Sequence, residues 1–288
     1  MNISLLTASF PLDSETIAEI KELCRITAIT DGCHYETVLK VAAASSYEST
    51  GFFVLAYDDE ANELVGAASA MDMIGLHTFE WSMVVAPMYR RLGIGTALFS
   101  VVQEGFNQRG ANGQLALVVE GAQFGRQFIE KSGYVYSFSE ATLEARPEAF
   151  AMHEDIQIQQ YVNEHEELVD IFSEAFGDLP EESAELIAYN TSEIGRILWV
   201  ARKGGHIVGT VTSSKEGEVQ WVTALAVHPK YQGQGIGSIL LSWVKDYALQ
   251  NGERYVMLDV EIENDKAIRV YEKAGFLKLM QIDYFSKG

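Results

Sequence analysis

In the second half of the chain, segments with apolar residues at helical spacing alternate with segments that are typical of β-strands. Residues at helical spacing follow Asn163, a good helix N-cap, and a second helix is predicted to start near Glu181. Two β-rich runs, 197–201 and 207–212, flank the glycine turn 203–205 and predict a hairpin. Helices and strands are therefore mixed in this half from its beginning.

The remainder of this half continues the mixture. The predicted elements are a strand over Val219–Val227, a helix containing Leu240, Leu241, Val244 and Ala248, a strand over 255–262, a helix over 267–274 and a final strand from Phe276. The expected order is two helices, a hairpin, a strand, a helix, a strand, a helix and a strand. This order predicts an α/β fold with a mixed sheet.

The whole pattern occurs twice. We therefore expect two domains, 1–146 and 147–288, with the first following the same order and placing its hairpin at 52–56 and 64–68. The matching segments, each 142 residues apart, are Val227–Tyr231 with Val85–Tyr89, Gly235–Gly237 with Gly93–Gly95, and Glu272–Phe276 with Glu130–Tyr134.

Composition limits the classes of partner. The 288 residues are 48% hydrophobic and carry a net charge of −20, which disfavours nucleic acid and suits a cationic substrate, although solubility alone explains the charge equally well. No stretch reads as a membrane span or a signal peptide. Cys24 and Cys33 form neither a disulfide framework nor a zinc pattern, so we expect a cytoplasmic protein without a metal.

A glycine-rich segment, Gln232–Gly237, lies between a predicted strand and the start of a helix. Backbone N–H groups at a helix start lack intrahelical partners, and glycines let a pyrophosphate approach them closely. The spacing is not that of a dinucleotide-binding loop, and the Gly-Lys-Ser/Thr of a P-loop is absent. A plain strand-to-helix turn is the alternative interpretation.

The neighbouring segments favour the anion-binding interpretation. Leu225–Ser238 resembles the central motif of the GNAT acetyltransferase superfamily, and Val260–Phe276 resembles the motif that follows it, with Asn264 and Tyr271 at the family spacing. The resemblance covers nearly all of 155–288 and, more weakly, 1–146. It implies tandem GNAT-like acyl-CoA N-acyltransferase domains that use acetyl-CoA as the acyl donor.

The resemblance also implies a role for each motif residue. Backbone groups of Leu225, Ala226 and Val227 would pair with the pantetheine arm, and Asn264 would hold the cofactor from the next strand. Tyr271 would protonate the departing thiolate as the general acid; a core tyrosine is the alternative. The residues whose amides would cradle the pyrophosphate are Gln232, Gly233, Gln234, Gly235, Ile236, Gly237 and Ser238.

The general base stays open. Many family members carry a carboxylate near the position of Thr223–Ala224, and this sequence has none there. The nearby carboxylates, each equally plausible as a solvated residue, are Glu218, Glu261 and Glu263. His228, before a proline, is interpreted as structural.

The first copy is expected to be catalytically degenerate. It keeps the glycine turn in Arg90–Gly95, but Ala122 stands where the second copy has Asn264, and Ile129 stands where it has Tyr271. An isoleucine cannot protonate a thiolate. Glu80, on the strand before the loop, leaves acetyl transfer by the first copy open as an alternative.

We therefore predict an acetyl-CoA-dependent N-acetyltransferase that acts on a primary amine of a small molecule or peptide and is active in its C-terminal half. The alternative is a non-catalytic acyl-CoA-binding or sensor protein built from the same two domains. The sequence is compatible with a homodimer and does not identify the amine acceptor.

Overall fold

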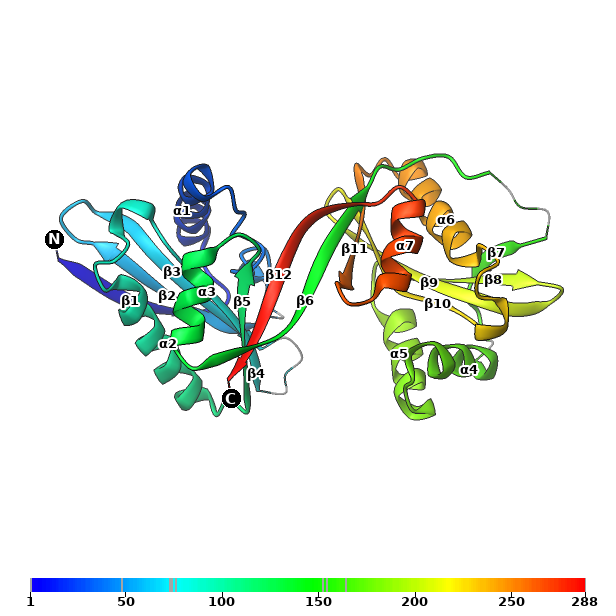
Figure 1. Cartoon of the computed structure of the whole chain (residues 1–288), viewed down its shortest axis with the longest axis horizontal. Helices are drawn as coiled ribbons and strands as arrows, with labels where there is room; N and C mark the ends of the chain where they lie inside the picture. The colour runs from blue at the N-terminus through cyan, green and yellow to red at the C-terminus, as the bar shows by residue number, and fades with distance from the viewer. Residues whose placement is uncertain are drawn as a thin grey trace. The chain divides into compact units, whose positions relative to one another are not determined.

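The computed structural model describes two compact units. It covers all residues except 1, 48, 73, 74, 76, 152, 154, 164 and 288. Unit 1 contains residues 1–140 together with 281–288, and unit 2 contains residues 141–280. Each unit is a mixed sheet covered by helices (Figure 1).

Unit 1 is built on a seven-strand arrangement ordered β1-β2-β3-β4-β5-β12-β6, in which β4 and β5 run parallel. Helices α2 and α1 pack on β3 and β4 from opposite faces (Figure 1). Its elements are β1 (Ile3–Ser9), α1 (Ser14–Asp31), η1 (Ala43–Ser45), β2 (Thr50–Asp58), β3 (Glu63–Asp72), β4 (Thr78–Val85), η2 (Pro87–Tyr89), α2 (Ile94–Arg109), β5 (Gly113–Val119), α3 (Gln123–Lys131), β6 (Tyr134–Ala145) and part of β12 (Leu277–Lys287).

An aromatic core lies under α2. Phe52, Phe79, Trp81 and Phe106 are each at most 1% exposed, and their rings meet edge-on or tilted. Phe285, from the far end of the chain, is fully buried in the same cluster. The C-terminal part of β12 therefore contributes to the core of unit 1.

The two long strands β6 and β12 are divided between the units. The C-terminal part of β12 pairs antiparallel with β5, Ile282 facing Val119, and Ser139 of β6 donates a hydrogen bond to Asp283 over 2.7 Å. Conversely, the C-terminal part of β6 lies next to β11 in unit 2, where the Thr142 hydroxyl donates to Asp259 over 2.6 Å. Each unit thus takes a strand segment from the other copy of the repeat.

Unit 2 has the strand order β6-β11-β10-β9-β8-β7, with β10 and β11 parallel. Helices α4 and α5 contact β8, β9 and β10, and α6 also contacts β9 and β10. The elements are β7 (Gln157–Gln160), α4 (His165–Phe176), α5 (Pro180–Ser192), β8 (Arg196–Lys203), β9 (His206–Glu216), β10 (Val219–Val227), η3 (Pro229–Tyr231), α6 (Ile236–Gln250), β11 (Tyr255–Glu261) and α7 (Asp265–Lys273).

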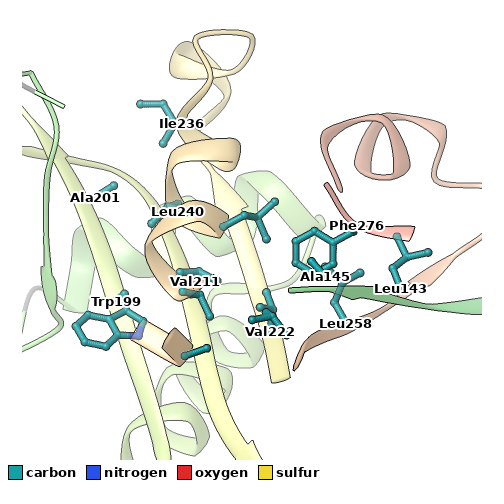
Figure 2. Packing of buried hydrophobic residues seen from close by; sticks show 14 of the residues in the cluster. Leu143, Ala145, Trp199, Ala201, Val211, Val222, Ile236, Leu240, Leu258 and Phe276 are labelled. Atoms are coloured by element: carbon teal, nitrogen blue, oxygen red, sulfur yellow. The ribbon is translucent and has the colours of Figure 1, made fainter. Parts of the chain in front are cut away.

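Alternating side chains of this sheet build two separate cores. Trp199 packs with the α6 side chains, while its neighbours Leu198 and Val200 pack with those of α4 and α5. Figure 2 shows Leu143 and Ala145 of β6 beside Phe276 in the α6 core. Successive side chains of these strands therefore point to opposite faces of the sheet, and helices cover both faces.

The predicted helices and strands of the second copy occur in the predicted order, and the strand Val219–Val227 has the predicted bounds. The structure adds a short strand, β7, before the two helices, which was not predicted from the sequence. In the first copy the prediction of two helices before the hairpin is wrong, since the described residues there form one α-helix, α1. Gly32, at φ 69°, ends this helix in a left-handed C-cap. None of the described helices has the length and apolar character needed to cross a membrane.

Candidate functional site

In unit 2 the parallel strands β10 and β11 separate along their length. Val219–Trp221 pair with Tyr255–Met257, and no further pair joins the two strands in the described residues. On its other side β10 stays paired with β9 as far as Val227. The backbone of β10 beyond Trp221 therefore presents polar groups along an edge without a strand partner.

A bulge lies on this separated part of β10. The register with β9 shifts by one residue between Thr223 and Ala226, and Ala224 adopts a positive φ of 48°. A bulge turns the backbone groups near it out of the regular ladder and is often found beside functional sites. The equivalent strand β4 pairs with β3 in unbroken register from Phe79 to Val85.

The glycine segment continues this edge into α6. Gly233 and Gly235 have φ values of 76° and 82°, and a Cβ atom at either position would meet no atom within 4 Å. No side chain caps α6, and its first bond runs from the Ile239 N–H to the Gly235 carbonyl. The N–H groups of Ile236, Gly237 and Ser238 therefore have no intrahelical partner and can receive an anion.

Two glutamines stabilise the loop from within. The Gln232 amide donates to the Val227 carbonyl over 3.1 Å, and the Gln234 amide donates to the Lys230 carbonyl over 3.3 Å. Lys203, at the end of β8, donates to the Gln234 side-chain oxygen over 3.2 Å. Sequence reasoning missed this lysine, which adds positive charge beside the open N–H groups.

Asn264 is the N-cap of α7. Its side-chain oxygen accepts a hydrogen bond from the Ala267 N–H over 3.1 Å. The side-chain amide donors of Asn264 have no partner in the described residues, so they are available to a ligand while the oxygen holds the helix.

Tyr271 lies on α7 and packs against the α6 core. Its ring centre is 6.2 Å from that of Phe276, in an edge-on arrangement. The hydroxyl has no hydrogen-bond partner in the described residues, and burial raises the pKa of the phenol above its usual range. The hydroxyl therefore stays protonated at neutral pH, as a proton donor must.

The carboxylates considered as bases lie in different surroundings. Glu218 precedes β10 at its paired end, away from the bulge, and its carboxylate is 3.3 Å from Arg254. Glu261 and Glu263 are exposed. The His228 ring accepts a hydrogen bond from the Lys230 N–H over 3.2 Å and so caps η3, as its structural interpretation predicted.

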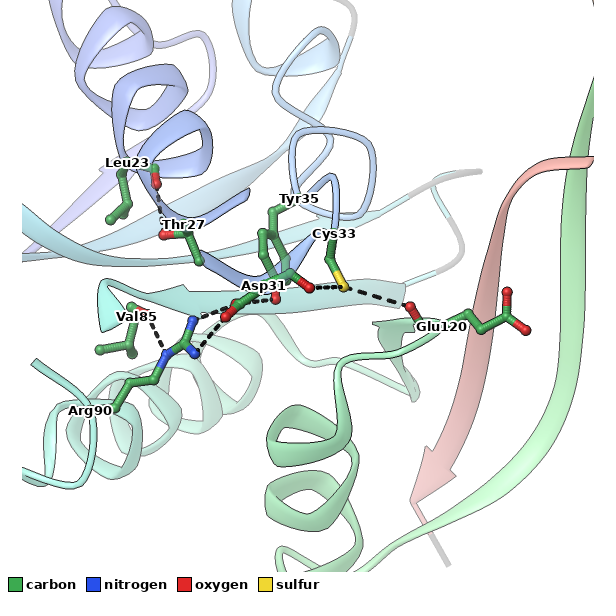
Figure 3. A network of polar contacts seen from close by, with 8 residues as sticks. All are labelled: Leu23, Thr27, Asp31, Cys33, Tyr35, Val85, Arg90 and Glu120. Carbon is green, nitrogen blue, oxygen red and sulfur yellow. Dashed lines mark hydrogen bonds and ion pairs between the residues drawn. The ribbon is translucent and has the colours of Figure 1, made fainter. Parts of the chain in front are cut away.

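Unit 1 repeats the loop with the same backbone. Arg91, which replaces the first glycine, has a φ of 64°, Gly93 has a φ of 91°, and α2 starts at Ile94 without a side-chain cap. The difference lies in Arg90, whose Nε–H donates to the Val85 carbonyl over 3.0 Å and whose two Nη groups bind Asp31 at 2.9 and 2.5 Å (Figure 3).

The segment after α1 reaches the end of β5. The Cys33 sulfur lies 3.7 Å from the carbonyl oxygen of Glu120, and the Tyr35 hydroxyl donates to Asp31 over 2.6 Å (Figure 3). Cys33 is only 6% exposed, and burial raises the pKa of its thiol. The chain's own residues therefore bridge the region between the ends of β4 and β5 in unit 1.

Comparison with known proteins matches both copies of the repeat to one family. Residues 16–134 and 164–276 each match the model of the Acetyltransferase (GNAT) family. The chain belongs to the GNAT family. It is a tandem GNAT protein, and the family uses acetyl-CoA as its acyl donor.

Solved structures agree with a tandem GNAT fold. A GCN5-related N-acetyltransferase from Sphaerobacter thermophilus is 20% identical, with a TM-score of 0.75 over 98% of this chain and 95% of that one. A tandem GNAT protein from the clavulanic acid biosynthesis pathway is 18% identical, with a TM-score of 0.69 over 98% of both chains. At these identities the likeness establishes the fold.

The two GNAT units differ at the positions that the motifs single out. Ala122 has backbone angles close to those of Asn264, φ −77° against −83°, but gives α3 no side-chain cap. Ile129 is 4% exposed in the core of unit 1. Glu80 is paired with Lys40 at 2.7 Å, which neutralises its charge.

The GNAT motifs gave no indication of a polar cluster on the α5 face of unit 2. Arg196, the first residue of β8, donates to the Asn190 side-chain oxygen over 3.3 Å, to the Tyr189 hydroxyl over 3.1 Å and to the Thr223 hydroxyl over 3.5 Å. Its guanidinium also lies 4.5 Å from the centre of the Tyr189 ring. No periodicity or spacing in the sequence brings these residues together.

Proposed function

We propose that the chain is an acetyl-CoA-dependent N-acetyltransferase that acts on a primary amine of a small molecule or peptide, and that unit 2 carries the reaction. The observation that supports this most strongly is the combination found in one unit: a bulged strand with an open edge that leads directly into an uncapped, glycine-rich helix start. An extended thioester arm ending in a pyrophosphate has the shape and charge to occupy both.

The proposed reaction is a direct transfer. The neutral amine attacks the thioester carbonyl, a C–N bond forms and the C–S bond breaks. The amine loses a proton, and the departing thiolate gains one. Backbone groups of Leu225 to Val227 would orient the thioester, and amides from Gln232 to Ser238 would bind the pyrophosphate, with Asn264 contributing its free amide donors.

Tyr271 is the proposed general acid. Its raised pKa keeps the phenol protonated, and its hydroxyl has no competing partner in the described part of the unit. The acidic protein would attract the amine in its cationic form, so the proton must leave before attack. We name no base, since each nearby carboxylate is either paired away from the bulge or exposed.

We propose that unit 1 does not catalyse the transfer. Its strand β4 has no bulge, its loop arginine is held by Asp31, and Ile129 replaces the acid. Cys33 and its neighbours lie where a second thioester arm would need space between β4 and β5. These contacts support a structural role for unit 1.

The test is release of free thiol from acetyl-CoA in the presence of a panel of primary amines. Tyr271→Phe should lower kcat by about 100-fold or more, because a positioned acid contributes about 10²- to 10⁴-fold. The affinity for CoA and the thermal stability should stay near those of the unmodified protein, because the lost hydroxyl has no partner in the described residues.

The same assay separates the alternatives. If CoA binds but no amine releases thiol, the chain is an acyl-CoA-binding or sensor protein and the transferase proposal is wrong. If amines release thiol and Tyr271→Phe turns over like the unmodified protein, the transferase proposal survives and the assignment of the acid fails.

A further inference from the structure

The Arg196 guanidinium is held in one place by neutral groups. Asn190, which is 1% exposed, donates its own amide to the Leu186 carbonyl over 2.8 Å, so its oxygen is fixed toward Arg196. The Tyr189 ring and hydroxyl add a stacking contact and a hydrogen bond. An arginine positioned in this way needs little reorganisation to bind a ligand.

Within the described residues, no carboxylate of the chain lies within ion-pair distance of Arg196. Arg109 and Arg146 also contact no carboxylate within the described residues. By comparison, Arg90 is bound by Asp31 and Arg254 by Glu218. The Arg196 Nε–H also has no partner in the described residues, so one edge of the guanidinium keeps donors that fit a carboxylate.

A buried hydroxyl on the same face is also without a partner. Thr212 is fully buried, and its Oγ1 makes no hydrogen bond in the described residues. It pairs across the ladder with Leu198 on one side and with Thr223 on the other, so it lies on the α5 face beside the residue that Arg196 contacts. The face of the sheet that carries Arg196 therefore also holds an unpaired polar group.

The cluster lies next to the bulge of β10. Thr223, the outermost contact of Arg196, directly precedes Ala224, whose positive φ forms the bulge. The pyrophosphate loop leads into α6, on the opposite face of the sheet from α4 and α5. An acceptor that approaches the thioester from the side without the cofactor therefore passes the Arg196 cluster.

We propose that Arg196 binds a carboxylate of the acceptor, and that the acceptor is a small amino acid whose amine lies a few bonds from that carboxylate. This inference rests on the proposed transferase function and deepens it. The carboxylate takes no part in bond making: the amine nitrogen forms the new C–N bond, the C–S bond breaks, and the thiolate receives the proton.

The experiment compares matched acceptors with the intact protein and acetyl-CoA. Each α-amino acid is assayed beside its carboxamide and beside the amine that lacks the carboxyl group, with thiol release as the readout. The carboxamide has the less basic amine and therefore a larger neutral fraction at pH 7. A preference for the free acid consequently reports recognition of the carboxylate.

Arg196→Met should lower kcat/KM for the free acids by about 10- to 150-fold, as expected for loss of a charge-assisted hydrogen bond. The change should lie mainly in the KM of the acceptor, while the KM for acetyl-CoA and the turnover of the carboxamides stay the same. For Arg196→Lys, kcat/KM for the free acids should lie between the values of the unmodified protein and of Arg196→Met, since lysine keeps the charge without the planar guanidinium. Arg254→Met, the same substitution at a surface arginine, is the control and should change none of these constants.

The outcomes are distinguishable. Equal kcat/KM for acids and carboxamides, or an equal fall for both in Arg196→Met, would overturn the carboxylate proposal while leaving the transferase intact. If no acceptor of any kind releases thiol, the transferase itself is wrong and the acceptor proposal falls with it. Unchanged CoA affinity and melting temperature in Arg196→Met show that its fold is preserved.

Discussion

At the scale of residues, the two GNAT units differ in the side chains that surround a loop of the same backbone conformation. Both units share the loop backbone, with positive φ at Arg91 and Gly93 in one and at Gly233 and Gly235 in the other. The side chains differ: Arg90 forms an ion pair with Asp31, whereas Gln232 donates a hydrogen bond to the Val227 carbonyl. The same backbone thus carries the proposed binding loop in unit 2 and an internal ion pair in unit 1.

The pair of Arg90 and Asp31 gives a prediction for stability against pH. Arg90 lowers the pKa of the Asp31 carboxyl below its usual value of 3.8. A lowered folded-state pKa means that the ionised form stabilises the fold above the unfolded pKa, and that this contribution is lost as the pH falls through the folded one. The side chains are 27% and 15% exposed, so solvent weakens the pair.

We expect Asp31→Asn to lower the free energy of unfolding by about 1–2 kcal/mol at pH 7. The difference from the unmodified protein should stay level down to pH 5 and shrink toward pH 3. Urea denaturation across this range is the measurement. A difference that grows as the pH falls would contradict the sign of the pKa shift.

At the scale of elements, the ends of helices and strands carry most of the difference between the units. The start of α7 is capped by a side chain and the start of α3 is not, although the two N-cap residues have nearly the same backbone angles. Likewise, β10 carries a bulge where β4 is regular.

The N-cap side chain can be removed from α7 and introduced at the start of α3. Asn264→Ala should destabilise unit 2 by about 1 kcal/mol, and Ala122→Asn should stabilise unit 1 by about 0.5–1 kcal/mol, because the backbone at residue 122 already suits a capping side chain. Hydrogen exchange in α7 and α3 would measure both changes. A loss of protection in α3 of Ala122→Asn would show that the cap does not form.

The start of α6 gives a matched pair for ligand binding. Gly235→Leu and Gly93→Leu place a side chain on equally left-handed backbone, φ 82° and 91°, with no atom within 4 Å of the added Cβ. Both should cost about 1–2 kcal/mol of stability. Only Gly235→Leu should abolish CoA binding in a calorimetric titration, and loss of binding in Gly93→Leu would contradict the assignment of the site to unit 2.

The sequence predicts elements better than it predicts the contacts between them. Apolar periodicity and the repeat located β10, α6 and α7, since each depends on local spacing. The bulge at Thr223 depends on the register with β9, and the Arg196 cluster depends on how α5 packs. The prediction of two helices before the hairpin of unit 1 was wrong because it extended the repeat to residues where the two copies do not match in sequence.

At the scale of the whole molecule, both units depend on β6 and β12. Residues 281–288 complete unit 1, and the residues of β6 from Ala141 onward join the core of unit 2. The repeat of the sequence and the compact units of the structure therefore divide the chain at different places.

Phe285→Ala tests this arrangement. Phe285 is fully buried in the core of unit 1, so its truncation should cost about 3–5 kcal/mol. Hydrogen exchange should show lost protection in β5 and in residues 134–140, with β8 to β10 much less affected. The matched Phe276→Ala, 1% exposed in the α6 core, should show the reverse. Equal loss in both units for either variant would mean that the units unfold as one.

Because the residues of β12 that belong to unit 1 follow unit 2 in the chain, unit 1 can be completed only late in synthesis. Residues 141–280 must be translated before Gln281–Lys287 can pair with β5. At the usual 5–20 residues per second, the nascent protein spends roughly 7–28 s with that edge unpaired. An open strand edge is a site for aggregation, so we expect the ribosome-bound N-terminal half to be exposed to aggregation during this interval.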